Sequence, residues 1–268
     1  MERIVVMGAG NLAHALVQGW QRVPNPPWSV AVLARSDSYL DKGWRPWPAP
    51  ISTDPAILSE SDLVVLAVKP KDVNAALQTV SQEAGPAVPV LSMVAGLALA
   101  TLRRHLPHAP LARAMPNICS AVGEGVTAVA FDRMASSERA EIRRLLEALG
   151  DVVEVEEALL DPITALSGSG PAYAYVLLEA LIEAGERLGL DPVLARRLSV
   201  QTLRGAAALA QAEPQLSPAD LIRLIASPGG TTEAALDRLA DEGVKRAVCE
   251  AIFQARLQAQ RLGSHPSA

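Results

Sequence analysis

Residues 4–13 read IVVMGAGNLA, and this stretch decides the fold of the chain. Its apolar start, 4–7, is short enough to be one buried strand, and apolar residues return at helical spacing after Ala13. Between them Gly8 permits a tight turn, and Gly10 lets a pyrophosphate approach backbone N–H groups at the start of a helix. The pattern G-x-G-x-x-A therefore predicts a strand, a turn and a helix that bind a dinucleotide.

This glycine pattern is short, and a glycine turn that binds nothing is its structural alternative. The chain that follows favours the dinucleotide, because apolar strand patterns alternate with helical ones. Together they predict a doubly wound α/β sheet of the Rossmann type in a first domain of residues 1–158. Its further strands are expected at 29–34, 63–68, 88–93, 111–115, 126–131 and 152–155.

Composition narrows the classes of partner. The chain of 268 residues is 50% hydrophobic and 20% charged, which is typical of a globular protein with a sizeable core. Its net charge of −5 gives no basic surface for nucleic acid or an anionic membrane, and no apolar run approaches the ~20 residues of a membrane span. We therefore expect a cytoplasmic protein with neither partner. Cys119, Cys249 and the four histidines lack metal-ligand spacing, so no metal is expected.

The end of the second predicted strand indicates which cofactor binds. NAD sites of this type place an acidic residue there for the ribose 2′-hydroxyl, whereas Arg35 and Ser36 offer a cation and a hydroxyl that suit a 2′-phosphate. NADPH is therefore favoured, although NADH stays possible because Asp37 could reach a ribose and Arg35 could be an ordinary surface cation. Beyond the next buried strand, residues 67–70 (AVKP) should lie beside the dinucleotide, with a solvated charge as the alternative for Lys69.

From 159 to 268 the pattern is helical throughout. Apolar residues recur at helical spacing from Tyr173 to Leu188, with charged residues on the opposite face. The apolar faces exceed what these helices can bury against one another, so we expect residues 159–268 to form a homodimer. Pro follows an N-cap residue at Asp191 and at Ser217. Further helices are expected at 192–212, 218–226, 232–240 and 242–262.

Two stretches of the helical half are rich in small residues, LSGSGPAY at 166–173 and SPGGTT at 227–232. Each is predicted to open a helix, whose unpaired N–H groups and positive dipole end suit a substrate carboxylate. The structural alternative is an ordinary helix start that a side chain caps. The candidate caps are Thr231 or Thr232 for the second helix and Ser169 or Asp161 for the first.

In their order along the chain, these motifs resemble those of pyrroline-5-carboxylate reductase, the last enzyme of proline biosynthesis. The resemblance rests on GAGNLA, AVKP, RAMPN, DPITALSGSGPAY and SPGGTT, and it covers essentially the whole chain. It implies an NADPH-dependent reduction of a cyclic imine by an interlocked dimer, often as part of a larger homo-oligomer. It also implies that Gly230, Thr231 and Thr232 hold the substrate carboxylate, and that the Thr232 hydroxyl addresses the ring nitrogen as the catalytic group.

The resemblance implies contacts for both ligands. Ser169, from LSGSGPAY, is expected with the substrate-binding residues. Two positions depart from the family pattern, Ile118-Cys119 in place of Thr-Pro and Leu224 in place of Asn, and neither touches the proposed chemistry. The expected NADPH contacts are Met7, Gly8, Ala9, Gly10, Asn11, Leu12, Arg35, Ser36, Ala67, Val68, Lys69, Pro70, Met93, Val94 and Ala95.

Two rival functions remain at this point. β-Hydroxyacid dehydrogenases resemble this chain at a glycine-rich helix opening, but they place a lysine four residues after its second glycine as the acid/base for an alcohol. This chain has Ala174 there, and no lysine occurs between Lys71 and Lys245. A catalytically silent NADP-binding scaffold would keep the turn at Gly8 but would need no second anion site.

Overall fold

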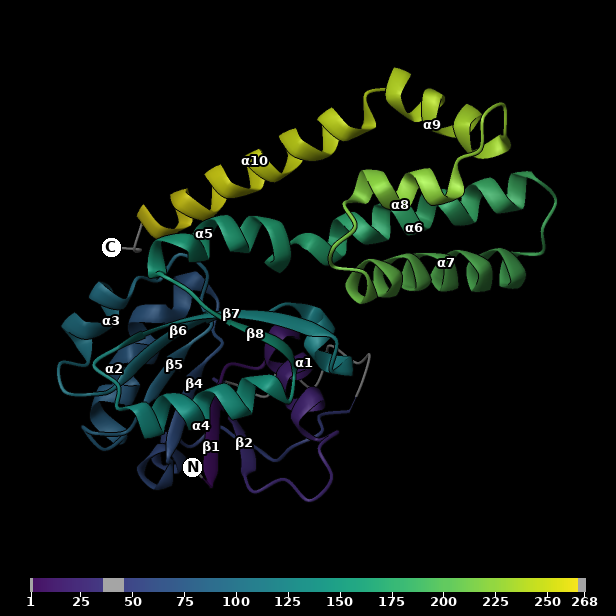
Figure 1. The fold of residues 1–268 in the computed structure, drawn as a ribbon. Coiled ribbons are helices and arrows are strands. Elements are labelled where there is room, and N and C mark those ends of the chain that lie inside the picture. The colour runs from purple at the N-terminus through teal and green to yellow at the C-terminus, as the bar shows by residue number, and fades with distance from the viewer. Residues whose placement is uncertain (1, 36–45, 265–268) are drawn as a thin grey trace. The chain divides into compact units, whose positions relative to one another are not determined.

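The computed structural model describes residues 2–35 and 46–264 (Figure 1). By their contacts the residues fall into two units, Met1–Pro171 with Gln254–Ala268 and Ala172–Phe253. Each unit is described by itself. Within the described residues, no helix combines the length and the apolar character that crossing a membrane requires.

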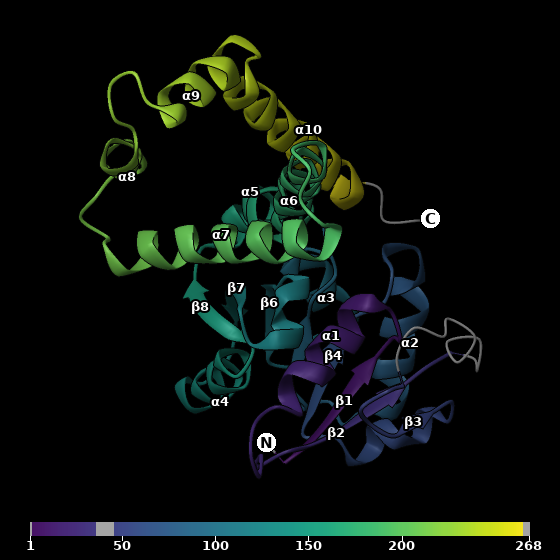
Figure 2. The same cartoon turned by 90° about the vertical axis from the view of Figure 1, so that its right-hand side faces the viewer.

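The first unit is built on one sheet. Within the described residues the sheet has eight strands in the order β3-β2-β1-β4-β5-β6-β7-β8, and Figure 2 shows β3, β2 and β1 at one end of it and β8 at the other. Neighbouring strands are parallel except β6 and β7, which are antiparallel. The strands are β1 (Arg3–Met7), β2 (Ser29–Leu33), β3 (Ile51–Ser52), β4 (Leu63–Leu66), β5 (Val90–Ser92), β6 (Leu111–Met115), β7 (Gly125–Asp132) and β8 (Gly150–Glu154).

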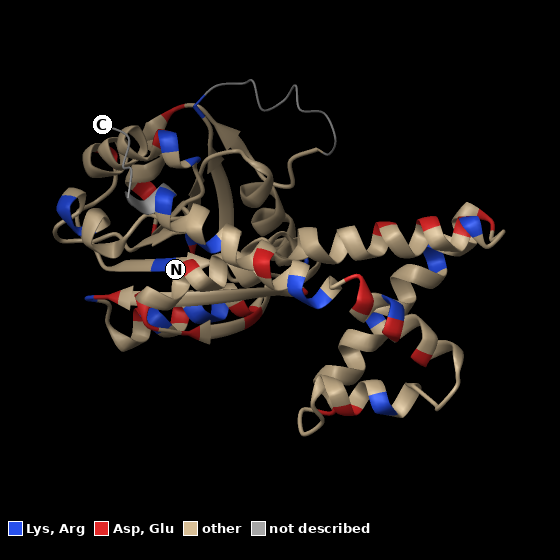
Figure 3. Ribbon diagram, turned by 90° about the horizontal axis from the view of Figure 1, so that it is seen from above, with Lys and Arg blue, Asp and Glu red and all other residues tan. Residues whose placement is uncertain are grey.

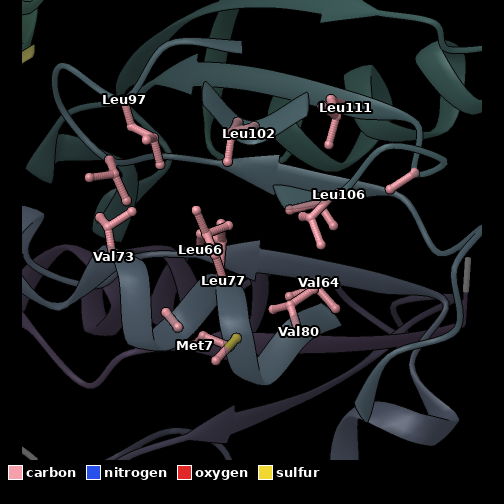
Figure 4. Packing of buried hydrophobic residues seen from close by; sticks show 14 of the residues in the cluster. Met7, Val64, Leu66, Val73, Leu77, Val80, Leu97, Leu102, Leu106 and Leu111 are labelled. Carbon is pink, nitrogen blue, oxygen red and sulfur yellow. The ribbon is translucent and has the colours of Figure 1, made fainter. Parts of the chain in front are cut away.

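Helices cover both faces of this sheet, so the predicted doubly wound α/β fold is confirmed (Figure 1). Alternate strand residues point to opposite faces: Val5 and Met7 join one core cluster, while Ile4 and Val6 join the other. Figure 4 shows the first cluster, in which α2 and α3 contribute side chains. Helices α1 and α4 pack on the other face. The four helices are α1 (Asn11–Trp20), α2 (Val73–Glu83), α3 (Leu99–His105) and α4 (Ser136–Glu147).

The antiparallel pair and the short strand β3 were not anticipated from the sequence. Strand β4 also ends at Leu66, two residues before the predicted end, because the chain leaves the sheet there although its residues stay apolar.

A buried arginine ties the sheet to the chain that follows it. Arg113 on β6 is only 4% exposed and donates from Nη2 to Asp161 Oδ1 at 2.6 Å and from Nη1 to Glu157 Oε1 at 3.3 Å. Leu160, on the short helix α5 (Leu160–Ile163), is fully buried in the core. These contacts place residues 160–171 with the sheet. The domain boundary after residue 158, which the sequence suggested, stays a prediction.

The second unit consists of helices whose starts follow the predicted caps. The Asp191 side chain accepts hydrogen bonds from the N–H groups of Val193 and Leu194, and Ser217 and Asp220 form a reciprocal capping box. The helices are α6 (Gly170–Arg187), α7 (Pro192–Ala212), α8 (Pro218–Ile225), α9 (Thr231–Asp241) and α10 (Val244–Ser264), and the first and last of these continue into the other unit.

Little of this helical unit is buried within one chain. Of residues 172–253, all of which the structure describes, only Gly185, Ala195 and Ser199 are buried. Gly185 lets α6 approach α7, since a Cβ at this position would lie 3.0 Å from the Ala195 Cβ. Large apolar side chains such as Val176, which is 67% exposed, face outward along α6. Figure 3 shows red and blue residues spaced along these helices among tan ones.

A carboxylate at the start of β4 is predicted to make folding pH-dependent. Asp62 Oδ2 accepts hydrogen bonds from the N–H groups of Arg3 and Glu2, and these bonds hold the pKa of Asp62 below its usual value. Its stabilising effect is therefore full above about pH 4 and is lost as pH falls through the lowered pKa. We expect Asp62→Asn to lower Tm at pH 7 and that difference to shrink as pH falls below about 4 through the lowered pKa, as followed by circular dichroism.

The matched control is Glu147→Gln, which removes an exposed carboxylate that accepts no backbone N–H bond. A Tm difference between Asp62→Asn and the parent that stays constant from pH 7 to about pH 2 would contradict the assignment.

Candidate functional site

The predicted cofactor residues follow strands that end side by side. Met7, Leu33 and Leu66, the last residues of β1, β2 and β4, stand in register across the sheet. Hydrogen bonds continue just past these ends, from Gly8 N to Leu33 O and from Ala67 N to Met7 O, both at 2.9 Å. The turn after β1 and the loops after β2 and β4 therefore share the carboxyl edge of the sheet, where ligands of open α/β sheets bind.

The two glycines of the first turn have different tasks. Gly8 adopts φ +109°, and a Cβ there would lie 2.7 Å from the Ala67 carbonyl oxygen, so this position excludes a side chain. At Gly10 nothing lies within 4 Å of where a Cβ would stand, so the glycine leaves open space beside the backbone. Gly10 is also the N-cap of α1 and makes no side-chain cap.

The start of α1 therefore offers donors to a ligand. The N–H groups of Asn11, Leu12 and Ala13 have no acceptor among the residues that the structure describes, whereas His14 N donates to Gly10 O at 3.0 Å. Such unpaired N–H groups at the positive end of a helix dipole suit a phosphate.

A cavity of about 470 Å³ opens at this edge of the sheet. Of the expected NADPH contacts, eight line it: Met7, Gly8, Ala9, Gly10, Arg35, Ala67, Val68 and Lys69. Asn11, Leu12, Pro70, Met93, Val94 and Ala95 do not line it, and Ser36 lies outside the described residues. Met93 nevertheless continues the same edge, because its N–H donates to Leu66 O at 2.9 Å.

The cavity also has lining residues that the sequence analysis missed. Lys71 and Asp72 follow Pro70 in a short 3₁₀ helix, and Asp72 Oδ1 accepts from Arg35 Nη1 at 2.6 Å. Two consecutive charged residues directly after the AVKP motif were the available signal. The others are Leu33, Ala34, Thr53, Pro55, Ala75, Ala76 and Thr79.

These features fit a dinucleotide phosphate. The turn at Gly8 and Gly10 lines the cavity together with the cations Arg35, Lys69 and Lys71, and the three unpaired N–H groups at the start of α1 directly follow this turn. Charge-assisted hydrogen bonds and a helix N-terminus are the usual means by which proteins hold phosphates. When bound, a nicotinamide dinucleotide supplies the hydride for a reduction.

A second helix start, in the other unit, repeats this uncapped arrangement. Gly230 is the N-cap of α9, and no side chain caps the helix, so the alternative of a Thr231 or Thr232 cap is wrong. The N–H groups of Thr231, Thr232 and Glu233 have no acceptor among the described residues. They are therefore available to an anionic ligand.

The glycines before α9 shape this start. Gly229 has φ +72°, and its N–H donates to Glu233 Oε2 at 2.6 Å. Gly230 N donates to Ser227 O at 2.9 Å, and a Cβ at Gly230 would lie 2.6 Å from Ser227 Oγ. The Gly230 N–H is thus already used inside the turn, and this glycine contributes space rather than a donor.

The LSGSGPAY stretch differs from its prediction. Residues before Gly170 are already helical, because α5 passes into a π-helix, Thr164–Gly168, before α6 begins. No free helix start therefore exists there, and Ser169 N donates to Thr164 O at 2.9 Å. Asp161 does not cap α6 either, since its carboxylate binds Arg113.

The π-helix is held by the loop after β6. Asn117 is 8% exposed, and its Nδ2 donates to Ser167 O at 3.2 Å while its Oδ1 accepts from Cys119 N at 3.1 Å. The hydrogen bond from Asn117 to Ser167 joins the RAMPN and LSGSGPAY motifs in one local structure. Isolated π-turns such as this one are frequent at functional sites. Ser169 follows this π-helix and belongs to the first unit, whereas Thr231 and Thr232 belong to the second.

Other reactive groups add little to these two sites. Burial, with the nearby Glu124 carboxylate, raises the pKa of the Cys119 thiol and keeps it protonated near neutral pH. Among the described residues, no three His, Cys, Asp or Glu side chains gather in a way that would hold a metal ion.

Comparisons with known proteins decide the family. A family model described as pyrroline-5-carboxylate reductase dimerisation matches residues 157–262, and one described as NADP oxidoreductase coenzyme F420-dependent matches 3–96. The chain is 35% identical to the pyrroline-5-carboxylate reductase of Corynebacterium melassecola over 99% of this chain and 100% of that protein. The chain belongs to the pyrroline-5-carboxylate reductase family. It is accordingly an NAD(P)-dependent oxidoreductase of the final step of proline biosynthesis, with an NADP-binding sheet domain.

Solved reductase structures share the fold. The enzyme of Coxiella burnetii is 31% identical, with a TM-score of 0.79 over 97% of each chain. The Plasmodium falciparum pyrroline carboxylate reductase with NADP bound is 24% identical, with a TM-score of 0.87 over 98% of each chain, and it shows the shared fold alone. The sequence-based expectations of fold, family, reaction and cofactor class are therefore confirmed.

The two glycines of the first turn make a matched pair of variants. We expect Gly10→Ala to keep the parent Tm but to weaken NADPH binding by about 10-fold or more, because its methyl group meets the pyrophosphate and no protein atom. Gly8→Ala should instead lower Tm, since its Cβ clashes with the Ala67 carbonyl. Thermal unfolding and fluorescence titration with NADPH measure the two effects. Unchanged NADPH binding by Gly10→Ala would refute the placement of the pyrophosphate.

Proposed function

We propose that the enzyme reduces L-1-pyrroline-5-carboxylate to L-proline with NADPH, and that the start of α9 holds the substrate carboxylate. The observation that carries this assignment is the uncapped N-terminus of α9, where the N–H groups of Thr231 and Thr232 lack an acceptor among the described residues. A carboxylate accepts hydrogen bonds from such groups and is favoured by the helix dipole. Gly230 allows the tight turn that presents these groups, because a Cβ there would lie 2.6 Å from Ser227 Oγ.

The reaction adds a hydride to the imine carbon and leaves a proton on the adjacent nitrogen, so that NADPH becomes NADP⁺ and the C=N bond becomes a C–N bond. When the imine enters protonated, its nitrogen already carries that proton and no strong buried base is needed. The Thr232 hydroxyl then donates a hydrogen bond to the lone pair that forms on the ring nitrogen and steadies the nitrogen as it loses positive charge. Positioning supplies most of the effect, because the reacting carbons must approach to about 3–3.5 Å.

The cofactor preference belongs to the same proposal. Arg35, Lys69 and Lys71 line the cavity at the edge where a 2′-phosphate would lie, so NADPH is favoured and NADH is accepted more weakly. The contacts that the cavity does not include, together with Ser36 outside the described residues, remain proposed NADPH contacts: Asn11, Leu12, Pro70, Met93, Val94 and Ala95. Ser169 remains a proposed substrate contact.

We further propose a homodimer, or a larger homo-oligomer, formed through the C-terminal helices. The exposed apolar side chains of residues 172–253 support it, because so much apolar surface is seldom left open to water. The model matched at 157–262 is also one of a dimerisation domain. A cytoplasmic location, with neither nucleic acid nor membrane as partner, stays a prediction from the composition.

Loss of the Thr232 hydroxyl tests the proposed catalytic contact. We expect Thr232→Ala to lower kcat/KM for L-1-pyrroline-5-carboxylate by about 10- to 10³-fold, by analogy with the removal of one positioned donor. Thr231→Ala is the matched control, because it keeps the backbone N–H and should stay within about threefold of the parent. Steady-state assays of NADPH oxidation measure both.

A Thr232→Ala enzyme within twofold of the parent would rule this role out. The same assay run with 3-hydroxyacids and NADP⁺ addresses the rival alcohol chemistry. Turnover of those acids, in place of the imine, would favour a β-hydroxyacid dehydrogenase.

The dimer proposal is tested on α6. We expect the parent to have the mass of a dimer or a larger assembly by light scattering after gel filtration, and Val176→Glu to shift it toward the monomer mass. Gln82→Glu is the matched control, because it adds the same charge to an exposed position on α2 of the sheet unit. A parent that is monomeric at micromolar concentration would overturn the proposal.

A further inference from the structure

The cation expected to select NADPH already has a partner. Arg35 Nη1 donates to Asp72 Oδ1 at 2.6 Å, and the side chain of Arg35 is 77% exposed while that of Asp72 is 26% exposed. Both residues line the 470 Å³ cavity, Arg35 after β2 and Asp72 before α2. The sequence separation of 37 residues shows that the fold, rather than local chain geometry, brings the two charges together.

The conformation of Asp72 indicates that this contact replaces a more usual one. Asp72 stands at the N-cap of α2, where aspartate is among the favoured residues because its carboxylate can accept N–H groups of the first turn. Its side chain makes no such cap hydrogen bond and turns to Arg35 instead. Its backbone is fixed by a hydrogen bond from Asp72 N to Lys69 O at 2.9 Å, within the 3₁₀ helix that begins with Pro70.

The charges of this cavity make two opposite demands. Three cations, Arg35, Lys69 and Lys71, and one acid, Asp72, line it, which leaves an excess of two positive charges. Cations suit a 2′-phosphate, whereas a carboxylate at the end of β2 suits the free 2′-hydroxyl of NADH. In this chain the cation at the end of β2 and an acid from a neighbouring element are paired with each other.

We propose that Asp72 is a specificity-determining residue that narrows the preference of this enzyme for NADPH over NADH. A 2′-phosphate that binds Arg35 must take the guanidinium from Asp72 and then lie near a second negative charge. A 2′-hydroxyl carries no charge, leaves the Arg35–Asp72 pair intact and can donate to the Asp72 carboxylate. The inference rests on the proposed binding of NADPH at Arg35, and it concerns the ratio of two affinities rather than the reaction.

The size of the effect follows from the exposure of the pair. Because Arg35 is largely exposed, its ion pair with Asp72 is screened by solvent and salt, so only a modest change is expected. We expect Asp72→Asn to tighten NADPH binding by about 3- to 10-fold and to leave the Kd of NADH within about twofold. The gain for NADPH should shrink as salt is raised from 50 to 500 mM, because the repulsion that the substitution removes is itself screened.

The test is a fluorescence titration of the full-length protein with NADPH and, separately, with NADH, without substrate. Glu147→Gln is the matched control, because Glu147 is likewise an acid paired with an arginine, Arg143 on α4, and does not line the cavity. Its Kd values for both cofactors should equal those of the parent. Thermal unfolding of each variant without cofactor checks that the fold is kept.

The proposal would be overturned if Asp72→Asn changed the Kd of NADPH and the Kd of NADH equally, or changed neither. Weaker binding of NADPH alone would overturn it as well, because Asp72 would then help to hold the phosphate site. The proposed cofactor site itself would be refuted by a parent protein that binds no NADPH, or by an Arg35→Gln variant whose Kd values for NADPH and NADH equal those of the parent. These results differ from those that overturn the role of Asp72, so the two failures are distinguishable.

Discussion

Helices α1 and α9 each have a glycine as N-cap and leave their first N–H groups without an acceptor among the described residues. At α1 the glycine is Gly10, and at α9 it is Gly230. Helix starts are ordinarily capped by a side chain that stabilises them by about 0.5–2 kcal/mol, and neither of these has such a cap. The rest of each unit holds that start in place. The register of β1, β2 and β4 fixes the first, and the turn at Ser227 and Gly229 shapes the second.

The features that the sequence predicted well are those with local causes. Helix α7 spans 192–212 as expected, because Asp191 caps it and Pro192 begins it. The strand and turn at residues 3–10 were equally clear, since an apolar run meets two glycines. Strand ends were predicted too long where apolar residues continue past the sheet, as they do after Leu66. At the carboxyl edge of the sheet, a loop that packs on the protein needs apolar residues just as a buried strand does, so the sequence pattern does not mark where the strand ends.

The features that the sequence did not predict depend on contacts between distant residues. The pairs Arg113–Asp161 and Arg35–Asp72 are 48 and 37 residues apart, and no periodicity connects such partners. The first pair explains why LSGSGPAY does not open a helix. Asp161, a candidate cap, is held by Arg113 instead, and the chain around it is already helical. The second pair places the carboxylate of Asp72 in the lining of a cavity for which the sequence motifs predicted only positive charge.

The sparse burial of residues 172–253 also bears on how folding depends on protein concentration. Three buried residues give this unit little apolar burial to offset the conformational entropy of its ordered chain. In the proposed homodimer the missing stabilisation comes from a second chain, so folding and association become one equilibrium for these helices. Each tenfold dilution then lowers the stabilising free energy of the folded, associated helices by about 1.4 kcal/mol of dimer. The sheet unit has its own core, so its stability does not depend on dilution in this way.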